Sequence, residues 1–211
     1  MKKFLILLFL VLAMLPQAAS AQDNTMSLTL FRDYRPAVIH MGDGRTVRSS
    51  LANIFLKNAS LLFKRGETTM EANMETIVSV DFDSLHYENI DNMLAVQVGS
   101  VGANKLYCAI VIDMKSYVTM LRNNVNISSL SLGDQISYTT VDLTPQEGME
   151  LPLVKHYYYL YNGELIKVHD REVSRRLDKE KKRLFKTIIS LPDFTWVDDN
   201  SLMKLLRAIS D

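Results

Sequence analysis

The sequence predicts an α+β protein: a strand-rich N-terminal roll or small barrel-like sheet followed by C-terminal helices. Three observations support this prediction. Short apolar segments separated by turn residues dominate residues 37–112, a further hairpin pattern follows at 155–169, and the periodicity becomes helical after residue 170. Because no linker, repeat or low-complexity segment divides these patterns, we expect a single mixed domain.

The N-terminal strands are expected to be short and joined by tight turns. Gly42-Asp43-Gly44 marks the first turn, and the long second strand is expected to break near Ser49 and Ser50. Five short strands bury little apolar surface as a flat sheet, so we expect them to curl. The expected strands cover residues 37–41, 45–57, 60–64, 68–72 and 77–82.

The second half of the chain combines hairpins and helices. Strands are expected at 92–98 and 105–112, across a turn at 99–102, then at 136–143, and at 155–161 and 164–169 around Asn162-Gly163. A helix capped by Asp113 is expected to end at Arg122. Further helices are expected after Asp170 and Asp178, and after Pro192 a last helix capped by Asp198 or Asp199.

Residues 1–21 have the pattern of a cleaved secretory signal peptide. Lys2 and Lys3 precede an apolar run from Phe4 to Leu15, and the small residues Ala19 and Ala21 suit cleavage after Ala21. An uncleaved anchor is the alternative, but the apolar run is shorter than the roughly 17 residues that a membrane-spanning helix needs. We therefore expect a mature domain over residues 22–211, periplasmic or extracellular.

The mature domain is expected to be soluble, with no further membrane span and no lipid-accepting cysteine at the cleavage point. Removing Lys2 and Lys3 leaves 22 basic against 24 acidic residues, a balance that favours no nucleic-acid partner. The single cysteine, Cys108, lies in an apolar strand pattern. We expect it to be buried and unreactive, and the fold to depend on packing rather than disulfides.

The strongest candidate for metal chemistry is the acidic cluster around Asp81, Asp83 and His86. On an extended strand, Asp81 and Asp83 share a face and could hold a hard cation together. The spacing matches no calcium loop, and the alternative is a solvated strand end and turn. The sequence carries no His-Glu-x-x-His, Gly-x-Ser-x-Gly or phosphate-loop pattern, so we expect no cofactor.

Two features suggest binding instead of catalysis. Tyr157, Tyr159 and Tyr161 alternate along one strand, where they could form an aromatic platform for sugar rings or a partner strand; a packed sheet face is the alternative. Residues 155–186 hold ten basic against five acidic side chains, a face that could meet an anionic surface or simply be solvated.

Four segments together carry a family resemblance: Asn53–Asn58, Met70–Met74, Val80–Phe82 and Ser190–Trp196. They resemble an uncharacterised family of exported proteins from Bacteroidetes-type bacteria. The resemblance implies a bacterial origin, a two-membrane cell and a periplasmic address, but no activity. The turn at Asp43-Gly44-Arg45 with its flanking strands also resembles small SH3-like or Sm-like barrels.

The functional expectation is a non-enzymatic binding or protein-interaction module, with an envelope protein or a glycan as the partner. A structural subunit of an envelope assembly is a related possibility. The alternative is an enzyme whose site is assembled from distant residues, with a metal at Asp81, Asp83 and His86.

Overall fold

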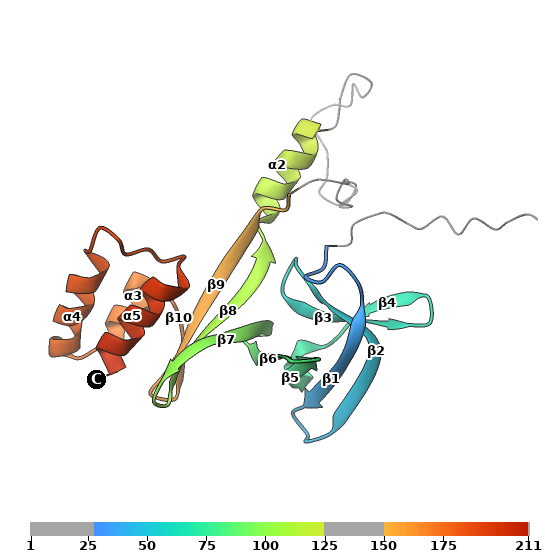
Figure 1. The fold of residues 1–211 in the computed structure, drawn as a ribbon, viewed down its shortest axis with the longest axis horizontal. Coiled ribbons are helices and arrows are strands. Elements are labelled where there is room, and N and C mark those ends of the chain that lie inside the picture. Colours follow the sequence, from blue (N-terminus) through green and yellow to red (C-terminus); the bar gives the residue numbers. More distant parts are fainter. Residues whose placement is uncertain (1–27, 125–149, 211) are drawn as a thin grey trace, which may run out of the picture.

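A computed structural model describes residues 28–124 and 150–210 of the 211-residue chain. These residues form one antiparallel sheet in the order β10-β9-β8-β7-β6-β5-β1-β2-β3-β4, with helices packed at one end (Figure 1). The strands are β1 (Arg35–Met41), β2 (Thr46–Phe55), β3 (Ser60–Arg65), β4 (Thr68–Glu71), β5 (Ile77–Phe82), β6 (Leu85–Ile90), β7 (Met93–Val101), β8 (Asn104–Ile112), β9 (Leu153–Tyr161) and β10 (Glu164–Lys167). The helices are η1 (Met74–Thr76), α2 (Met114–Asn124), α3 (Asp170–Arg175), α4 (Lys179–Ile189) and α5 (Asp199–Ser210).

The hairpin of β1 and β2 turns where the sequence predicts it. The Met41 amide donates to the Arg45 carbonyl at 2.9 Å, and the Gly44 amide donates to the Met41 carbonyl at 3.0 Å. Gly44 has a φ of 83°, which a residue with a side chain adopts only at a cost. The loop is therefore a three-residue turn that ends in a left-handed glycine.

A bulge bends β2 in its middle. Arg35 lies opposite Ala52 whereas Ala37 lies opposite Ser49, so β2 carries one extra residue opposite Pro36. Proline has no N–H to donate, and an extra residue bends and twists its strand. The break expected in this strand is therefore confirmed as a bulge.

The curled sheet meets itself at the loop between β2 and β3. The Ala59 carbonyl accepts from the Leu94 amide of β7 at 2.8 Å, and the Leu56 carbonyl accepts from the Ile112 amide of β8 at 2.7 Å. The prediction of a curled, strand-rich N-terminal part is confirmed as a half-barrel. Its interior holds the first core, which includes Ile54, Leu61, Val80, Phe82, Tyr87 and Leu94.

The C-terminal helices cover the far end of the long strands β7, β8 and β9, away from β1–β4 (Figure 1). A second core lies between these layers and includes Leu106, Tyr159, Phe185, Leu202, Leu205 and Leu206. Helix α2 packs on a third, smaller cluster through Tyr117 and Leu121, together with Leu28 and Leu56. The α+β prediction is confirmed in outline, although most of the fold is strand.

Two expectations about the middle of the chain are wrong. A strand end and turn were expected at residues 83–91, yet β6 pairs with both β5 and β7. Its buried residues Tyr87 and Ile90 are masked in the sequence by the polar residues between them. The turn expected at 99–102 instead lies at Gly102, where φ is 58°, because β7 continues to Val101.

Several expectations fall outside the described residues, namely the signal peptide over 1–21 with Ala19 and Ala21, and the strand over 136–143. Among the helices that the structure describes, none is both long and apolar enough to cross a bilayer.

Candidate functional site

A groove of about 500 Å³ is lined by residues of the first five strands and opens where β2 and β3 separate. Its floor is apolar and combines Ile39 of β1, Leu61 and Phe63 of β3, and Ile77 of β5. Leu61 is fully buried, whereas Val47 at the mouth is 45% exposed. The groove therefore joins the first core to the surface, and an apolar group placed in it would leave water.

Basic side chains line the rim of the groove. Arg48 lies on β2, and Lys64 and Arg65 lie at the end of β3; all three are exposed. None of them forms an ion pair with another described residue. The Lys64 ammonium lies 4.8 Å from the centre of the Tyr34 ring, which holds it by a cation–π contact.

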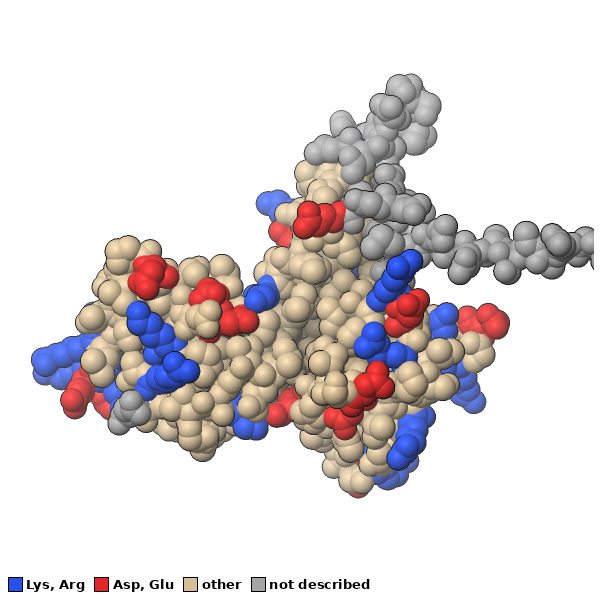
Figure 2. All heavy atoms as spheres, viewed as in Figure 1, with Lys and Arg blue, Asp and Glu red and all other residues tan. Residues whose placement is uncertain are grey.

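The one acid of the groove is Glu71, and it is already engaged. The Asn58 amide donates to the Glu71 carboxylate at 2.7 Å. Hydrogen bonds from Ser60 and from Asn58 hold the pKa of Glu71 below 4.5. The rim is therefore positive overall, with three cations against one carboxylate that other groups satisfy (Figure 2 shows basic side chains over this part of the sheet).

The groove also exposes a strand edge. Residues 52–55 of β2 pair with β3, whereas residues 46–49 pair only with β1, and the bulge residues Ser50 and Leu51 pair with neither strand. The bulge opposite Pro36 turns this half of β2 away from β3, and the β3–β4 hairpin projects from the sheet (Figure 1). The wall of the groove is thus a strand with a free side.

The predicted metal residues come together only in part. The Asp81 carboxylate accepts from His86 Nδ1 at 2.5 Å and from His40 Nε2 at 2.8 Å, on the outer face of the sheet. These bonds, with His86 the larger cause, lower the pKa of Asp81 from 3.8. Asp83 instead lies exposed in the β5–β6 turn with a φ of 51°.

Each of the two histidines directs a ring nitrogen at the Asp81 carboxylate, so these two nitrogens are engaged in hydrogen bonds with Asp81. Within residues 28–124 and 150–210, no group of three or more His, Cys, Asp or Glu side chains has an arrangement suited to a metal ion. The sequence prediction missed His40, which lies 41 residues before Asp81 and reaches it only through the pairing of β1 with β5.

The predicted tyrosine platform is covered. Tyr157, Tyr159 and Tyr161 face the C-terminal helices and are at most 5% exposed. Tyr159 donates to the Leu202 carbonyl at 2.7 Å, and Tyr161 donates to the Ile209 carbonyl at 2.8 Å. The alternating tyrosines share one face of the strand, as predicted. That face is packed against the C-terminal helices, so it offers no surface to a sugar ring.

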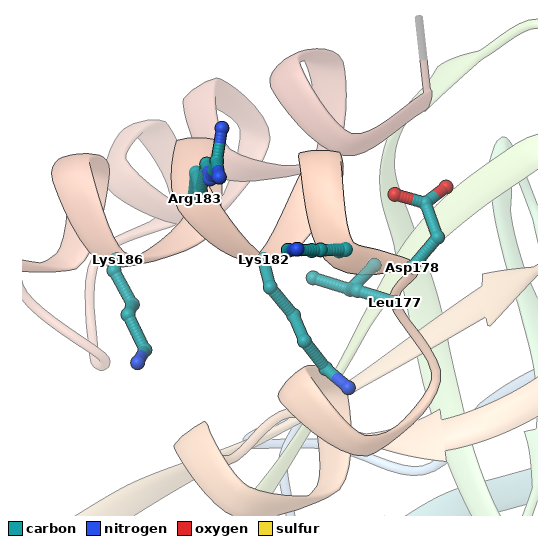
Figure 3. Close-up of a pocket in the computed structure, with 6 residues that line it drawn as sticks. Leu177, Asp178, Lys182, Arg183 and Lys186 are labelled. Atoms are coloured by element: carbon teal, nitrogen blue, oxygen red, sulfur yellow. The ribbon is translucent and has the colours of Figure 1, made fainter.

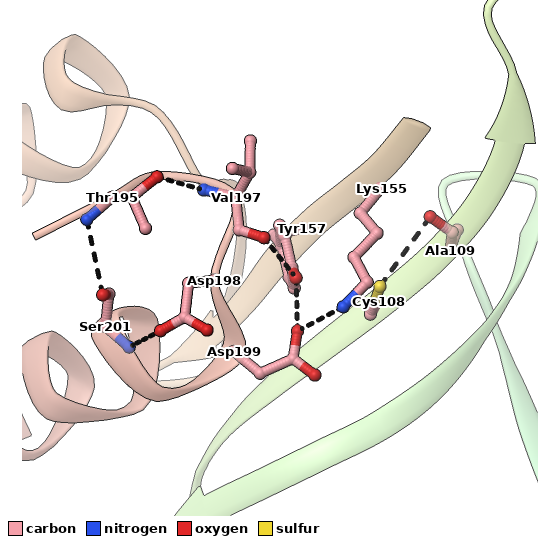
Figure 4. A network of polar contacts seen from close by, with 9 residues as sticks. All are labelled: Cys108, Ala109, Lys155, Tyr157, Thr195, Val197, Asp198, Asp199 and Ser201. Carbon is pink, nitrogen blue, oxygen red and sulfur yellow. Dashed lines mark hydrogen bonds and ion pairs between the residues drawn. The ribbon is translucent and has the colours of Figure 1, made fainter. Parts of the chain in front are cut away.

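Tyr157 belongs to a polar network at the start of α5 (Figure 4). Its hydroxyl donates to the Asp199 carboxylate, which also accepts from Lys155 Nζ at 3.0 Å. Burial, and then the bond to Asp199, raises the pKa of Tyr157, while the Tyr157 bond lowers the pKa of Asp199. Burial raises the pKa of nearby Cys108 to about 11, as expected for an unreactive thiol.

Four of the ten cations in the basic stretch over 155–186 have described partners, and four others form a stripe on α4. Lys155, Arg175 and Arg176 form ion pairs, and Lys181 donates to the Ile209 carbonyl. The stripe lines a hollow of about 410 Å³, and Figure 3 shows Lys182 and Arg183 pointing to different sides. The stripe consists of Lys179, Lys182, Arg183 and Lys186.

The groove was not predicted, although one signal for it exists. Between Asp43 and Glu67 the chain has five basic residues and no acidic one. Charge segregation of this kind indicates a positive surface, but only the fold shows that Arg48 and Arg65 flank the same apolar floor.

In comparisons with known proteins, no family model matches this chain, and no curated protein or solved structure shows significant similarity to it.

Proposed function

We propose that this protein is a non-enzymatic binding module that works outside the cytoplasm, and that the groove lined by strands β1 to β5 is its ligand site. The observation that carries the proposal is a groove of about 500 Å³ that combines an apolar floor with three rim cations, none of which forms an ion pair with a described residue. A ligand with an apolar body and an acidic group fits both features.

The apolar floor supplies most of the binding free energy. Burial of apolar surface contributes roughly 25 cal/mol per Å², so about 200 Å² contributes about 5 kcal/mol before the entropy of association is subtracted. Each exposed ion pair contributes about 0.2–1 kcal/mol. The three rim cations therefore contribute more to specificity for a negatively charged ligand than to its affinity; they are Arg48, Lys64 and Arg65.

The partner we propose is a protein of the cell envelope and not a glycan. Aromatic faces are the common means of holding sugar rings, and the Tyr157, Tyr159 and Tyr161 face is packed under α5. The rim of the groove offers cations and a free strand edge instead, which are features that recognise a polypeptide.

The address outside the cytoplasm rests on the signal-peptide pattern. If the chain carries a cleaved signal peptide, the protein recovered from the periplasm begins at Gln22. The variant Ala21→Leu should leave the precursor uncleaved, because the peptidase pocket takes only small residues. Mass spectrometry of the recovered protein measures both. A periplasmic protein that still begins at Met1 would contradict the expected cleavage.

The ligand site is tested with anilinonaphthalene sulfonate, an apolar anion that fluoresces on leaving water. We expect saturable binding to the folded mature chain. The double variant Arg48→Glu, Arg65→Glu should bind about tenfold more weakly, since two attractions become repulsions.

A matched control separates the groove from general charge. The double variant Lys182→Glu, Arg183→Glu makes the same change in net charge on α4 and should leave the affinity unchanged. If binding is not saturable, or if both double variants weaken it equally, the groove is not the site.

A further inference from the structure

The occupant of the groove can be specified from the free side of β2. We propose, on the basis of the function proposed above, that the groove takes an extended acidic segment of a partner protein, which adds to the sheet as a strand along residues 46–51 of β2.

The direction of the backbone groups follows from the β1–β2 turn. Because Met41 donates to Arg45 in a hydrogen-bonded pair, alternation makes Ile39 with Val47 the next such pair. The amides and carbonyls of Thr46 and Arg48 then point away from β1. Since β3 pairs with β2 only from Ala52 onward, no strand of residues 28–124 or 150–210 lies beside these groups.

The edge lacks most of the features that usually protect an edge strand. Natural edges are blunted by prolines, by several charges or by bulges, or are covered by another element, and here the bulge at Ser50 and Leu51 lies at one end of the edge. Residues 46–51 hold one charged residue, Arg48, and no proline, and Val47 and Leu51 are 45% and 42% exposed. An edge with exposed apolar side chains is suited to adding a strand.

The shape of the site limits what can be added. The six residues of the free edge span roughly 20 Å at about 3.3 Å per residue, which is the length of one short strand. The β3–β4 hairpin stands on the other side of the groove, with Lys64 and Arg65 facing it. A single extended segment fits between these walls, with alternate side chains directed at the apolar floor.

The charges decide against a second copy of this chain and in favour of an acidic segment. If two β2 edges paired, the Arg48, Lys64 and Arg65 side chains of both copies would meet, and like charges facing each other oppose association. An acidic segment meets three cations without ion-pair partners among the described residues.

The test uses a synthetic peptide, acetyl-(Glu-Val)₃-amide, and ¹H–¹⁵N NMR of the ¹⁵N-labelled mature chain. We expect shifts of the β2 amides, and at least tenfold slower hydrogen exchange at the Thr46 and Arg48 amides, which would become hydrogen-bonded. The matched (Lys-Val)₃ peptide should bind at least tenfold more weakly. An N-methylated (Glu-Val)₃ peptide, which keeps its charges but loses alternate N–H donors, should also bind at least tenfold more weakly.

The outcomes separate this inference from the proposed function. If the N-methylated peptide binds as well as its parent, or if the dye binds in the groove and the acidic peptide does not, strand addition is wrong and the ligand site stands. If neither dye nor peptide binds, both are wrong. A concentration-dependent dimer, seen by light scattering and lost on Arg48→Glu, would also overturn the inference, because the edge would then serve a second copy.

Discussion

At the scale of single residues, the three buried tyrosines show how polar groups join the sheet to the helices. Each ring fills the second core, and each hydroxyl reaches a hydrogen-bond acceptor in or beside α5. The acceptors differ in one respect: Tyr157 binds the ionisable Asp199, whereas Tyr159 binds a backbone carbonyl. This difference makes one contact sensitive to pH and the other insensitive.

We predict that Tyr157→Phe and Tyr159→Phe each lower the free energy of unfolding by about 1 kcal/mol at neutral pH. The Tyr157 bond lowers the pKa of Asp199, so the stability it contributes is present above the ordinary Asp pKa of 3.8 and is lost as pH falls through the lowered value. The Tyr157→Phe loss should therefore shrink below pH 4, and the Tyr159→Phe loss should persist.

Urea unfolding of the two variants and the parent chain between pH 3 and pH 7 measures both losses. Asp199 is 43% exposed, so water screens its contribution and keeps it near the small value given above. Equal pH dependence for the two variants would contradict the assignment of Asp199 as the titrating partner.

At the scale of elements, the sequence predicts the strands and helices better than their faces and turns. Alternation at Tyr157, Tyr159 and Tyr161 locates a strand, but it is the same for a packed face as for an exposed one. The β7–β8 turn was misplaced because Gly99 looks like a turn residue. In the structure Gly99 lies inside β7, where the register shifts beside α5.

The reason for a glycine at position 99 is the close approach of α5. A Cβ atom built at Gly99 would lie 2.9 Å from Cε and Sδ of Met203. We predict that Gly99→Ala costs about 0.5–1 kcal/mol in the parent chain, because the flexible methionine has to move. In a Met203→Ala background the same change should stabilise by a few tenths of a kcal/mol, since alanine restricts the unfolded chain.

A double-mutant cycle by urea unfolding measures this coupling. If Gly99→Ala has the same effect in both backgrounds, Met203 is not what excludes a side chain there.

The candidate groove also arises at the element scale, which explains why sequence patterns did not predict it. The break near Ser49 was predicted, but its consequence depends on pairing. The extra residue of β2 lies opposite Pro36, and the bulge that it makes turns β2 away from β3. This separation leaves a free edge of β2 beside Phe63. Likewise, His40 reaches Asp81 through strand pairing across 41 residues, a separation that no local spacing reveals.

At the scale of the whole molecule, the two ends of the sheet differ in how the helices cover them. The C-terminal helices cover one end of the sheet and bury its tyrosine face, and in the described part of the chain these helices do not extend over β1–β4 at the other end (Figure 1). The α+β class predicted from the sequence is confirmed in outline. The packed helical end and the strands β1–β4 together form a scaffold that presents the groove.

The most direct test of this account is the location of dye binding, read as a ¹H–¹⁵N shift map of the mature chain with anilinonaphthalene sulfonate. The account predicts shifts at the amides around the groove in β1, β2 and β3, and none along α4. Shifts confined to residues 179–186, with the groove amides unmoved, would contradict it, because the ligand would then be held by the basic stripe on the helix.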